Sequence, residues 1–380
     1  MHNKSIDYLI IGPAHPYRGG IAETNHELAL AFKKNGKKVQ IWTFNKLYPK
    51  FIFPGKTQFS NQNAPKNIDI KRMIHAYSPF QWHSVVKEIK ALNPEVIIFR
   101  YWTPFLAICY GYIARNVGSN IKCIGMVDNW IPHENRISDK FLNNYFGNGC
   151  SSFITLSKSV ANEIKLNFSK PILKGFHPIN EFLPFPISKI KARKNLNLSS
   201  SASYILFFGL IRKYKGLDLL IDAFKILSKE NPKLELIIAG EFYESKKKYY
   251  NLIKNYHLEN NVKIFPYFLN KDDLRDFFCA SKLVILPYKS ATQSGIAPLA
   301  YKYLKPLVVT DIHGLSEPVF KDKTGVVCKI DSDSIADGIK EAMDPKNYIK
   351  FKKQISIKRK NYTWENFTNE TMSFLLEKFG

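Results

Sequence analysis

Short apolar segments alternate with longer amphipathic segments along almost the whole chain, and this alternation constrains the fold most. The apolar segments are β-rich runs of four to six residues, many of them bounded by Gly, Pro or Asn, as expected of buried parallel strands. They cover residues 8–11, 39–43, 95–99, 123–127, 153–156, 204–208, 234–239, 262–265, 283–286 and 307–310. Strands that alternate with helices indicate βαβ units, and therefore an α/β protein with parallel sheets.

The alternation occurs in two sets, separated by a break without helical periodicity. The stretch 177–188 reads HPINEFLPFPIS and contains three prolines, which is typical of a linker. We therefore predict two Rossmann-like domains in tandem, at 1–177 and 189–355. The linker is expected at 178–188. A closing C-terminal helix at 356–380 is expected to pack back toward the first domain, and ligands are expected in a cleft between the domains.

Composition limits the class of protein. The chain has 380 residues, a hydrophobic fraction of 45% and a net charge of +24, which excludes a disordered chain and suggests an anionic partner. The five cysteines are scattered without a pairing pattern, so reduced thiols are expected. The apolar stretch 96–114 is interrupted by Arg100, Thr103 and Pro104, so it predicts no membrane span. We expect a cytoplasmic protein without a signal peptide.

The loop after the first predicted strand is the first segment suited to ligand binding. It runs from Gly12 to Ile21 and places Gly19 and Gly20 at the start of a predicted helix. Free backbone N–H groups and the helix dipole favour an anion or a sugar oxygen there. A tight turn that needs glycine remains an alternative, and the loop lacks the GxGxxG pattern of dinucleotide-binding proteins.

Three further loops follow strands of the second set. Gly209, Arg212 and Lys215 offer an accessible backbone and two cations to a diphosphate, the alternative being a solvated basic turn. A second loop offers a dense set of hydrogen-bonding groups, although threonine and serine there could instead cap a helix. Its candidate residues are Thr292, Gln293, Ser294 and Gly295. The third loop, 311–317, ends in Glu317.

Together these motifs resemble glycosyltransferase family 4, also called group 1. The resemblance covers essentially the whole chain and is clearest from about 203 to 345. The motifs are Gly19-Gly20-Ile21, the segment DNWIPHE at 128–134, a Gly-x5-Lys-Gly pattern at 209–216, DLLIDAF at 218–224, IIAG at 237–240, KPLVVTD at 305–311, GLSE at 314–317 and Thr324-Gly325. This family has the GT-B fold, retains anomeric configuration and needs no metal.

The resemblance implies roles for individual residues. Lys215 matches the lysine that binds the donor diphosphate. Leu210 occupies the place of the partner arginine, so Arg212 is expected to substitute for it. Gly20 matches the glycine beside the donor phosphate or sugar, and Glu317 matches the glutamate of the GG-x-x-E segment. The nucleotide base is expected near Phe268 and Leu269.

The chain departs from the family pattern at two places. The glutamates of the family's E-x7-E motif are replaced by Ala291 and Leu299, so Thr292 and Gln293 are expected to replace the first of them. Asp128 stands where many members have histidine, with His133 shortly after it. We predict that Asp128 orients an acceptor hydroxyl or acts as a base, the alternative being a turn cap.

The acceptor side is predicted from the first domain. We assign acceptor contacts to His15, Arg18, Arg100, Trp102 and Glu134, with packing on the sheet as the alternative for the strand-end residues Arg100 and Trp102. The loop 47–56 carries aromatic residues between lysines, which suits either an acidic bilayer and a lipid tail or a loop folded on its own domain. Asp331 and Asp333 form a D-x-D pair, but they precede a helix and are read as N-cap residues. No metal site and no cofactor are predicted.

We therefore predict a hexosyl-type glycosyltransferase that transfers sugar from a nucleotide diphosphate donor to a lipid-linked or glycan acceptor during cell-surface polysaccharide synthesis. A nucleotide-sugar epimerase of related fold and a basic nucleic-acid-binding protein are the alternatives. The charge favours a membrane, because it is concentrated in two segments. Residues 33–100 hold 13 Lys and Arg against 3 Asp and Glu, and residues 346–360 hold 7 against none. A peripheral contact with an anionic membrane is expected, at the cytoplasmic face of the inner membrane.

Overall fold

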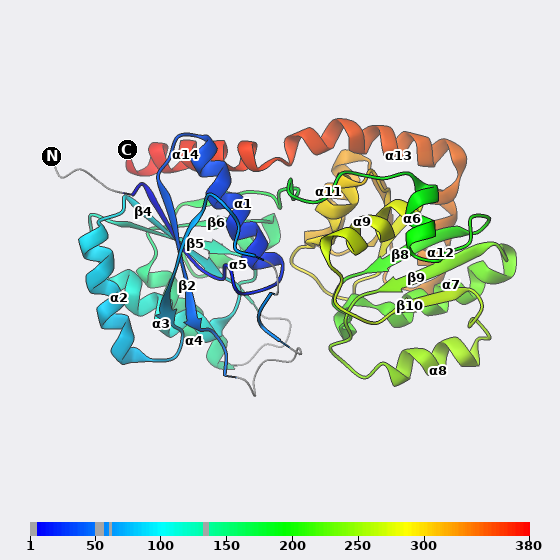
Figure 1. Ribbon diagram of the computed structural model, residues 1–380, viewed down its shortest axis with the longest axis horizontal. Helices are drawn as coiled ribbons and strands as arrows, with labels where there is room; N and C mark the ends of the chain where they lie inside the picture. The colour runs from blue at the N-terminus through cyan, green and yellow to red at the C-terminus, as the bar shows by residue number, and fades with distance from the viewer. Residues whose placement is uncertain (1–5, 50–56, 61–62, 132–136) are drawn as a thin grey trace. The chain divides into compact units, whose positions relative to one another are not determined.

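The computed structural model describes residues 6–49, 57–60, 63–131 and 137–380 (Figure 1). The chain folds into two compact units, one of Met1–Pro178 with Trp364–Gly380 and one of Ile179–Thr363. The residues from 179 onward that we expected in a linker belong to the second unit, where Ile179 and Leu183 are buried in its core. The second unit also ends eight residues later than the expected boundary at 355.

The first unit contains a parallel sheet of seven strands in its described part, in the order β3-β2-β1-β4-β5-β6-β7. The central strands β1, β4 and β5 consist mostly of apolar residues and are almost entirely buried, as expected of parallel strands covered on both faces. The strands are β1 (Tyr8–Ile11), β2 (Val39–Lys46), β3 (Asp69–His75), β4 (Val96–Tyr101), β5 (Lys122–Val127), β6 (Ser152–Thr155) and β7 (Ile172–Lys174).

Helices cover both faces of this first sheet. One face packs against α1 and α14 through residues such as Phe32 and Phe367, and the other against α2, α3 and α4 through residues such as Ile89 and Phe146. The helices are α1 (Gly20–Lys34), α2 (Pro79–Leu92), η1 (Pro104–Leu106), α3 (Ala107–Asn116), α4 (Ile137–Gly149), α5 (Lys158–Lys165) and α14 (Trp364–Phe379).

The second unit is built around a parallel sheet of six strands, all of them in the described part of the chain. Their order is β10-β9-β8-β11-β12-β13, so the chain reverses direction across the sheet between β8 and β11. The strands are β8 (Ser203–Phe208), β9 (Leu234–Ala239), β10 (Val262–Phe265), β11 (Leu283–Leu286), β12 (Leu307–Thr310) and β13 (Gly325–Cys328). A switch point of this kind is where ligands bind in open parallel sheets.

Helices again cover both faces of the second sheet. Leu220 and Phe224 of α7 pack on one face, and Phe277 of α9 and Leu315 of α11 on the other. The helices are α6 (Lys189–Asn195), η2 (Lys213–Lys215), α7 (Leu217–Glu230), α8 (Lys247–Asn255), α9 (Lys271–Ala280), α10 (Ile296–Lys302), α11 (His313–Asp322), α12 (Ser332–Met343), α13 (Pro345–Lys358) and η3 (Arg359–Asn361).

The prediction of two Rossmann-like halves is confirmed, and every predicted strand overlaps an observed one. The prediction was incomplete at the sheet edges, because β3, β7 and β13 were missed and each of them is an edge strand. An edge strand has fewer neighbours, so its sequence needs less apolar character. All five cysteines are buried and none is paired.

The last helix packs on the first helix of the same unit (Figure 1). Asn35 Nδ2 donates to Thr368 Oγ1 at 3.0 Å, and Lys34 Nζ lies 3.3 Å from Glu365 Oε2. Trp364 and Phe367 are buried beneath them. The chain therefore contributes two segments, 330 residues apart at their nearest ends, to one face of the first sheet.

Candidate functional site

Loops from three strands of the second sheet meet at its carboxyl edge. Gly216 follows η2 with φ +66°, and a β-carbon there would lie 1.9 Å from the carbonyl oxygen of Pro287, just after β11. Gly314, at the start of α11, would place a β-carbon 2.0 Å from the carbonyl oxygen of Thr292. Only glycine permits these approaches. The loops after β8, β11 and β12 are therefore held against one another.

Hydrogen bonds reinforce the contact between the first two loops. The backbone N–H of Lys289 donates to Tyr214 O at 2.6 Å. Lys289 Nζ and Lys248 Nζ both donate to Asp218 Oδ2, at 2.8 Å and 2.7 Å. Asp218 thereby ties the start of α7 to the loop after β11 and to α8, so η2 has little freedom to move.

Lys215 is the central cation of this edge. Its side chain is buried, with a relative exposure of 7%, and Nζ lies 2.9 Å from the position a β-carbon on Gly209 would take. Burial, and to a smaller extent the charge of Arg212, lowers the pKa of Lys215 to about 8. Among the described residues no carboxylate or carbonyl accepts a hydrogen bond from Nζ, which lies 5.5 Å from the centre of the Tyr288 ring. A bound anion would compensate this desolvated charge.

Arg212 is exposed, and its charge affects Lys215. Its guanidinium lies 5.1 Å from the centre of the Tyr243 ring, which leaves its donors open toward solvent. Arg212 and Lys215 are three residues apart. The turn η2 joins them, and the backbone N–H of Lys215 donates to Arg212 O at 2.9 Å. The pair can therefore contact one polyanionic ligand.

The polar loop after β11 lies next to this cation pair. Residues 292–294 are half-buried and Gly295 is exposed, and Ser294 Oγ accepts from the backbone N–H of Ile296 at 3.2 Å. Ile296 would lie 3.2 Å from a β-carbon on Gly209, so the loop reaches the end of β8. Ala291 and Leu299, which replace the family's glutamates, pack on the core beneath the loop.

Glu317 and the pair Phe268 and Leu269 occupy other positions around the second sheet. Glu317 lies on α11, one turn after Gly314, with Oε2 3.9 Å from Nε2 of His313. Phe268 follows β10, the edge strand two places from β8, and its side chain is 46% exposed. Leu269 beside it packs partly on the core.

Sequence reasoning did not single out Tyr288, although it belongs to this edge. The residue directly follows β11 and Pro287, and its ring is buried below Lys215. Burial raises the pKa of Tyr288, so its hydroxyl stays protonated. The signal was present, because a tyrosine immediately after a buried parallel strand lies at the ligand edge.

In the first unit, the loop after β1 leaves space at the start of α1. Gly19 has φ +111°, and among the described atoms none lies within 4 Å of a β-carbon built on Gly19 or Gly20. His15 and Arg18 are half-buried in this loop. The His15 backbone N–H donates to His26 Nε2 at 3.0 Å, and that of Arg18 donates to Gln58 O at 3.0 Å. The first turn of α1 is thus open to a ligand.

Asp128 and Arg100 form a buried ion pair in the first unit. Arg100 Nε donates to Asp128 Oδ2 and Nη2 donates to Oδ1, both at 2.6 Å. Arg100 is 1% exposed and Asp128 is 5% exposed. We predicted a base at Asp128 and an acceptor contact at Arg100, but this geometry engages both carboxylate oxygens and keeps the guanidinium below the surface. The pair has the geometry of a rigid support for neighbouring groups.

The other predicted acceptor residues are divided between described and undescribed parts of the chain. Trp102 is half-buried, and its Nε1 donates to Tyr48 Oη at 3.1 Å. His133 and Glu134 lie outside the described residues, as does most of the aromatic loop predicted at 47–56.

Asp331 plays the capping role that the sequence predicted. Its Oδ1 accepts from the backbone N–H of Ser334 at 2.7 Å, and α12 begins at the next residue. Within the described ranges, no three His, Cys, Asp or Glu side chains gather so as to hold a metal ion. None of the helices in those ranges is both long and apolar enough to cross a bilayer.

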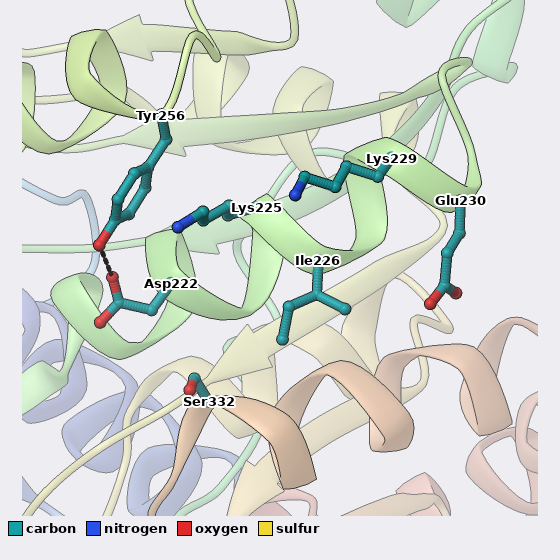
Figure 2. A pocket seen from close by; sticks show the side chains of 7 residues that line it. All are labelled: Asp222, Lys225, Ile226, Lys229, Glu230, Tyr256 and Ser332. Carbon is teal, nitrogen blue, oxygen red and sulfur yellow. Dashed lines mark hydrogen bonds between the residues drawn. The ribbon is translucent and has the colours of Figure 1, made fainter.

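A pocket of about 440 Å³ lies elsewhere in the second unit, between α7 and the start of α12 (Figure 2). The pocket contains the aromatic ring of Tyr256, and Lys225 Nζ lies over this ring, 4.3 Å from its centre. Tyr256 Oη donates to Asp222 at 2.9 Å. None of the residues predicted from the sequence lines this pocket, whose walls are Asp222, Lys225, Ile226, Lys229, Glu230, Tyr256 and Ser332.

Known proteins resemble this chain in sequence and in fold. Residues 188–362 match the family described as Glycosyl transferases group 1. A lipopolysaccharide 1,2-N-acetylglucosaminetransferase of Salmonella typhimurium is 28% identical over 46% of this chain and 48% of its own length. The chain thus spans about half the length of this curated relative.

Solved structures match nearly the whole chain. Sucrose-phosphate synthase from Thermosynechococcus elongatus has a TM-score of 0.77 at 16% identity and covers 98% of this chain and 99% of its own. HepE of Anabaena in complex with UDP has a TM-score of 0.73 at 16% identity and covers 97% and 100%. These likenesses show the GT-B fold. In sequence, residues 188–362 resemble the group 1 glycosyltransferases.

Proposed function

We propose that the protein transfers a sugar from a nucleotide diphosphate donor to a lipid-linked or glycan acceptor in cell-surface polysaccharide synthesis. The observation that carries this proposal is the buried Lys215 ammonium, which has Arg212 beside it and no anionic partner among the described residues. A cation desolvated without compensation is costly unless a ligand supplies the opposite charge. The donor diphosphate is the ligand that this edge fits.

The same two cations can promote the reaction. Negative charge grows on the diphosphate as its bond to the sugar breaks, and a preorganised cation stabilises the transition state more than the ground state. Low water access around Lys215 strengthens this effect. If the two cations suffice, transfer needs no metal ion and no cofactor.

The remaining predicted residues complete the proposed donor site. We assign the Gly209 backbone, the 292–295 loop and Glu317 to the donor sugar and phosphates, and Phe268 with Leu269 to the nucleotide base. We assign Gly19 and Gly20, at the start of α1, to a donor phosphate or sugar oxygen. Uridine is the first nucleotide to test, because HepE binds UDP.

We further propose a retaining reaction and an acceptor bound by the first unit. Retention follows from the family resemblance. The acceptor is expected to contact His15, Arg18, Trp102, His133 and Glu134, with Arg100 and Asp128 behind them. A glycan or lipid-linked glycan is supported by the Salmonella relative, which is named for transfer to lipopolysaccharide. The comparisons do not favour the epimerase alternative.

The test is transfer and donor hydrolysis with a panel of UDP-, GDP- and ADP-sugars. Lys215→Ala should lower kcat/KM by about 10²-fold or more, the usual effect of removing one group that stabilises developing negative charge. Lys213→Ala is the matched control, because this exposed lysine lies on the same turn. Unchanged transfer by Lys215→Ala would exclude the diphosphate assignment.

Contact with an anionic membrane is part of the proposal. Helix α13 exposes Ile349 and Ile357, at 67% and 52%, beside exposed Lys350 and Lys353. The sequence has no Asp or Glu from 345 to 364. Apolar side chains among lysines suit an acidic bilayer surface, because the lysines meet headgroups while the isoleucines enter the interface. The inner membrane's cytoplasmic face is the expected location.

Vesicle sedimentation tests this contact. Binding should require acidic lipid and should weaken in the double variant Lys350→Glu/Lys353→Glu. Lys247→Glu/Lys254→Glu on α8 is the control with the same change in net charge, because both of its lysines are exposed in the same unit. Equal binding to neutral vesicles, or equal losses in the two variants, would exclude α13 as the contact.

A further inference from the structure

A polar cluster interrupts the apolar face of the first sheet that is covered by α1 and α14. Along β4 and β5 the apolar side chains on this face belong to its core. They are Val96, Ile98, Ile124 and Met126. Side chains alternate between the two faces of a strand. Arg100 and Asp128 therefore continue the same face at its carboxyl end, where charge replaces hydrocarbon.

This cluster is closely supported from β1 and α1. A β-carbon on Gly12 would lie 2.8 Å from Cβ of Arg100 and 2.7 Å from Nδ2 of Asn25. Asn25 is fully buried on α1, and its Nδ2 donates to Pro13 O at 2.8 Å. Among the described residues, nothing donates to Asn25 Oδ1. The ion pair is thus enclosed by backbone and amide groups, and its two charges neutralise each other.

His177 is half-buried and lies close enough to the ion pair for the charges of Arg100 and Asp128 to affect it. The residue follows β7, and its Nδ1 lies 3.1 Å from Pro178 O. A carbonyl oxygen can only accept, so Nδ1 carries the hydrogen and Nε2 presents a lone pair. No described residue donates to Nε2. Burial lowers the pKa of His177, the charge of Arg100 lowers it further, and Asp128 and Pro178 O oppose them.

We propose that Nε2 of His177 accepts a hydrogen bond from a hydroxyl of a sugar bound at the carboxyl edge of the first sheet. The inference deepens the proposed function and rests on it, since it assigns a sugar-hydroxyl contact to a residue outside the predicted site. The chemistry selects a hydroxyl over a phosphate, because an uncharged acceptor lone pair repels anionic oxygen and the neighbouring ion pair has no net charge. His177 is then a binding residue, and its hydrogen bond to Pro178 O orients the ring.

Two substitutions at His177 distinguish the roles of its two ring nitrogens. His177→Asn keeps an amide N–H near the place of Nδ1 and removes the acceptor at Nε2, whereas His177→Gln can place an amide oxygen near Nε2. We expect His177→Asn to raise a sugar KM by about five- to tenfold, the effect of losing one hydrogen bond between uncharged groups, with kcat less affected. His177→Gln should recover most of that loss.

The sugar can belong to the donor or to the acceptor, and two arms of the assay distinguish them. UDP release from UDP-glucose is measured alone and with octyl glucoside as the acceptor probe. A higher KM for UDP-glucose in His177→Asn assigns the contact to the donor sugar, and a higher KM for octyl glucoside alone assigns it to the acceptor. Unchanged values for both would overturn the proposal. So would equal losses in Asn and Gln variants with lowered unfolding midpoints, which indicate a structural role.

A spectroscopic readout keeps the proposal testable without turnover. The ¹⁵N resonance of His177 Nε2, assigned by its loss in His177→Gln, should have the shift of a bare nitrogen in the free protein. It should move when UDP-glucose or octyl glucoside is added. A shift without catalysis would support this contact and count against the proposed transfer, whereas transfer without any shift would reject the contact alone.

Discussion

The carboxyl edges of the two sheets differ in whether their buried cation is paired with a carboxylate. In the second unit Lys215 is buried with another cation beside it and no described anion to pair with. In the first unit the buried cation Arg100 has both oxygens of Asp128 as partners, and burial lowers the pKa of His177, which both charges affect. Two cations that are similarly buried therefore have different roles. An uncompensated charge is a ligand site, whereas a compensated charge is a scaffold.

Removing the carboxylate that pairs with Arg100 should have the largest effect on stability. Asp128→Ala leaves the Arg100 charge buried and unpaired, so the first unit should lose about 3–5 kcal/mol of unfolding free energy. Tryptophan fluorescence measures this unit alone, because Trp42, Trp82, Trp102, Trp130 and Trp364 all belong to it and the chain has five tryptophans.

The double variant Arg100→Met/Asp128→Leu serves as the control for that measurement. Because it removes both charges and fills the space with apolar groups, it should be markedly more stable than Asp128→Ala. A loss in Asp128→Ala below about 1 kcal/mol would show that the pair behaves as a surface ion pair.

The two edges also differ in how closely their loops pack, and glycine substitutions test this. Gly314→Ala places a β-carbon on the carbonyl oxygen of Thr292, so the second unit should lose about 1–3 kcal/mol through forced backbone movement. Gly20→Ala meets open space and should leave the stability of the first unit almost unchanged. Far-UV circular dichroism follows both units. Equal losses in the two variants would contradict the difference between the edges.

How far the sequence predicts this molecule depends on where each residue lies in its sheet. Buried central strands such as β1 and β8 are continuous apolar runs, and their alternation with helices predicts both Rossmann-like halves. The edge strand β3, with sequence DIKRMIH, carries mostly exposed and charged residues, so its pattern does not differ from that of a loop. Strand periodicity therefore detects burial on two faces better than it detects pairing.

For the candidate site the limit is different. Lys215 and Arg212 are identified by their distance from the end of β8, which the sequence contains. The partner of Asp128 cannot be identified in this way, because Arg100 lies on the neighbouring strand, 28 residues away in the sequence. His177 was assigned to the edge of a linker, since nothing in its local sequence indicates proximity to that pair. Side-chain partnerships across strands need the register, which the sequence pattern alone does not determine.

The uncompensated lysine should make anion binding depend on pH. The pKa of Lys215 is lowered from 10.5 to about 8 in the protein without ligand, because burial disfavours the charged form. Only the protonated lysine attracts a diphosphate. The affinity for UDP should be nearly constant below about pH 7 and should fall by up to about tenfold per pH unit above pH 8.

Calorimetric titration with UDP at about pH 7, 8 and 9 checks this dependence. Lys215→Met should bind UDP weakly and should lose most of the decline above pH 8, because the titrating group is gone. Lys213→Met is the control and should keep the decline. If the wild-type affinity were unchanged to about pH 9, Lys215 would not contact the diphosphate.

The smallest effect is expected at an exposed ion pair of the first unit, which shows how little charge matters outside the buried sites. Lys34 and Glu365 join α1 to α14, but their side chains are 71% and 56% exposed. Solvent screens such a pair, so Glu365→Ala should change the unfolding free energy by less than about 1 kcal/mol. The attachment of α14 should instead depend on Trp364 and Phe367, which stay buried in this variant. A loss as large as that of Asp128→Ala, measured by the same tryptophan fluorescence, would mean that pairing rather than burial fixes charged groups in this unit.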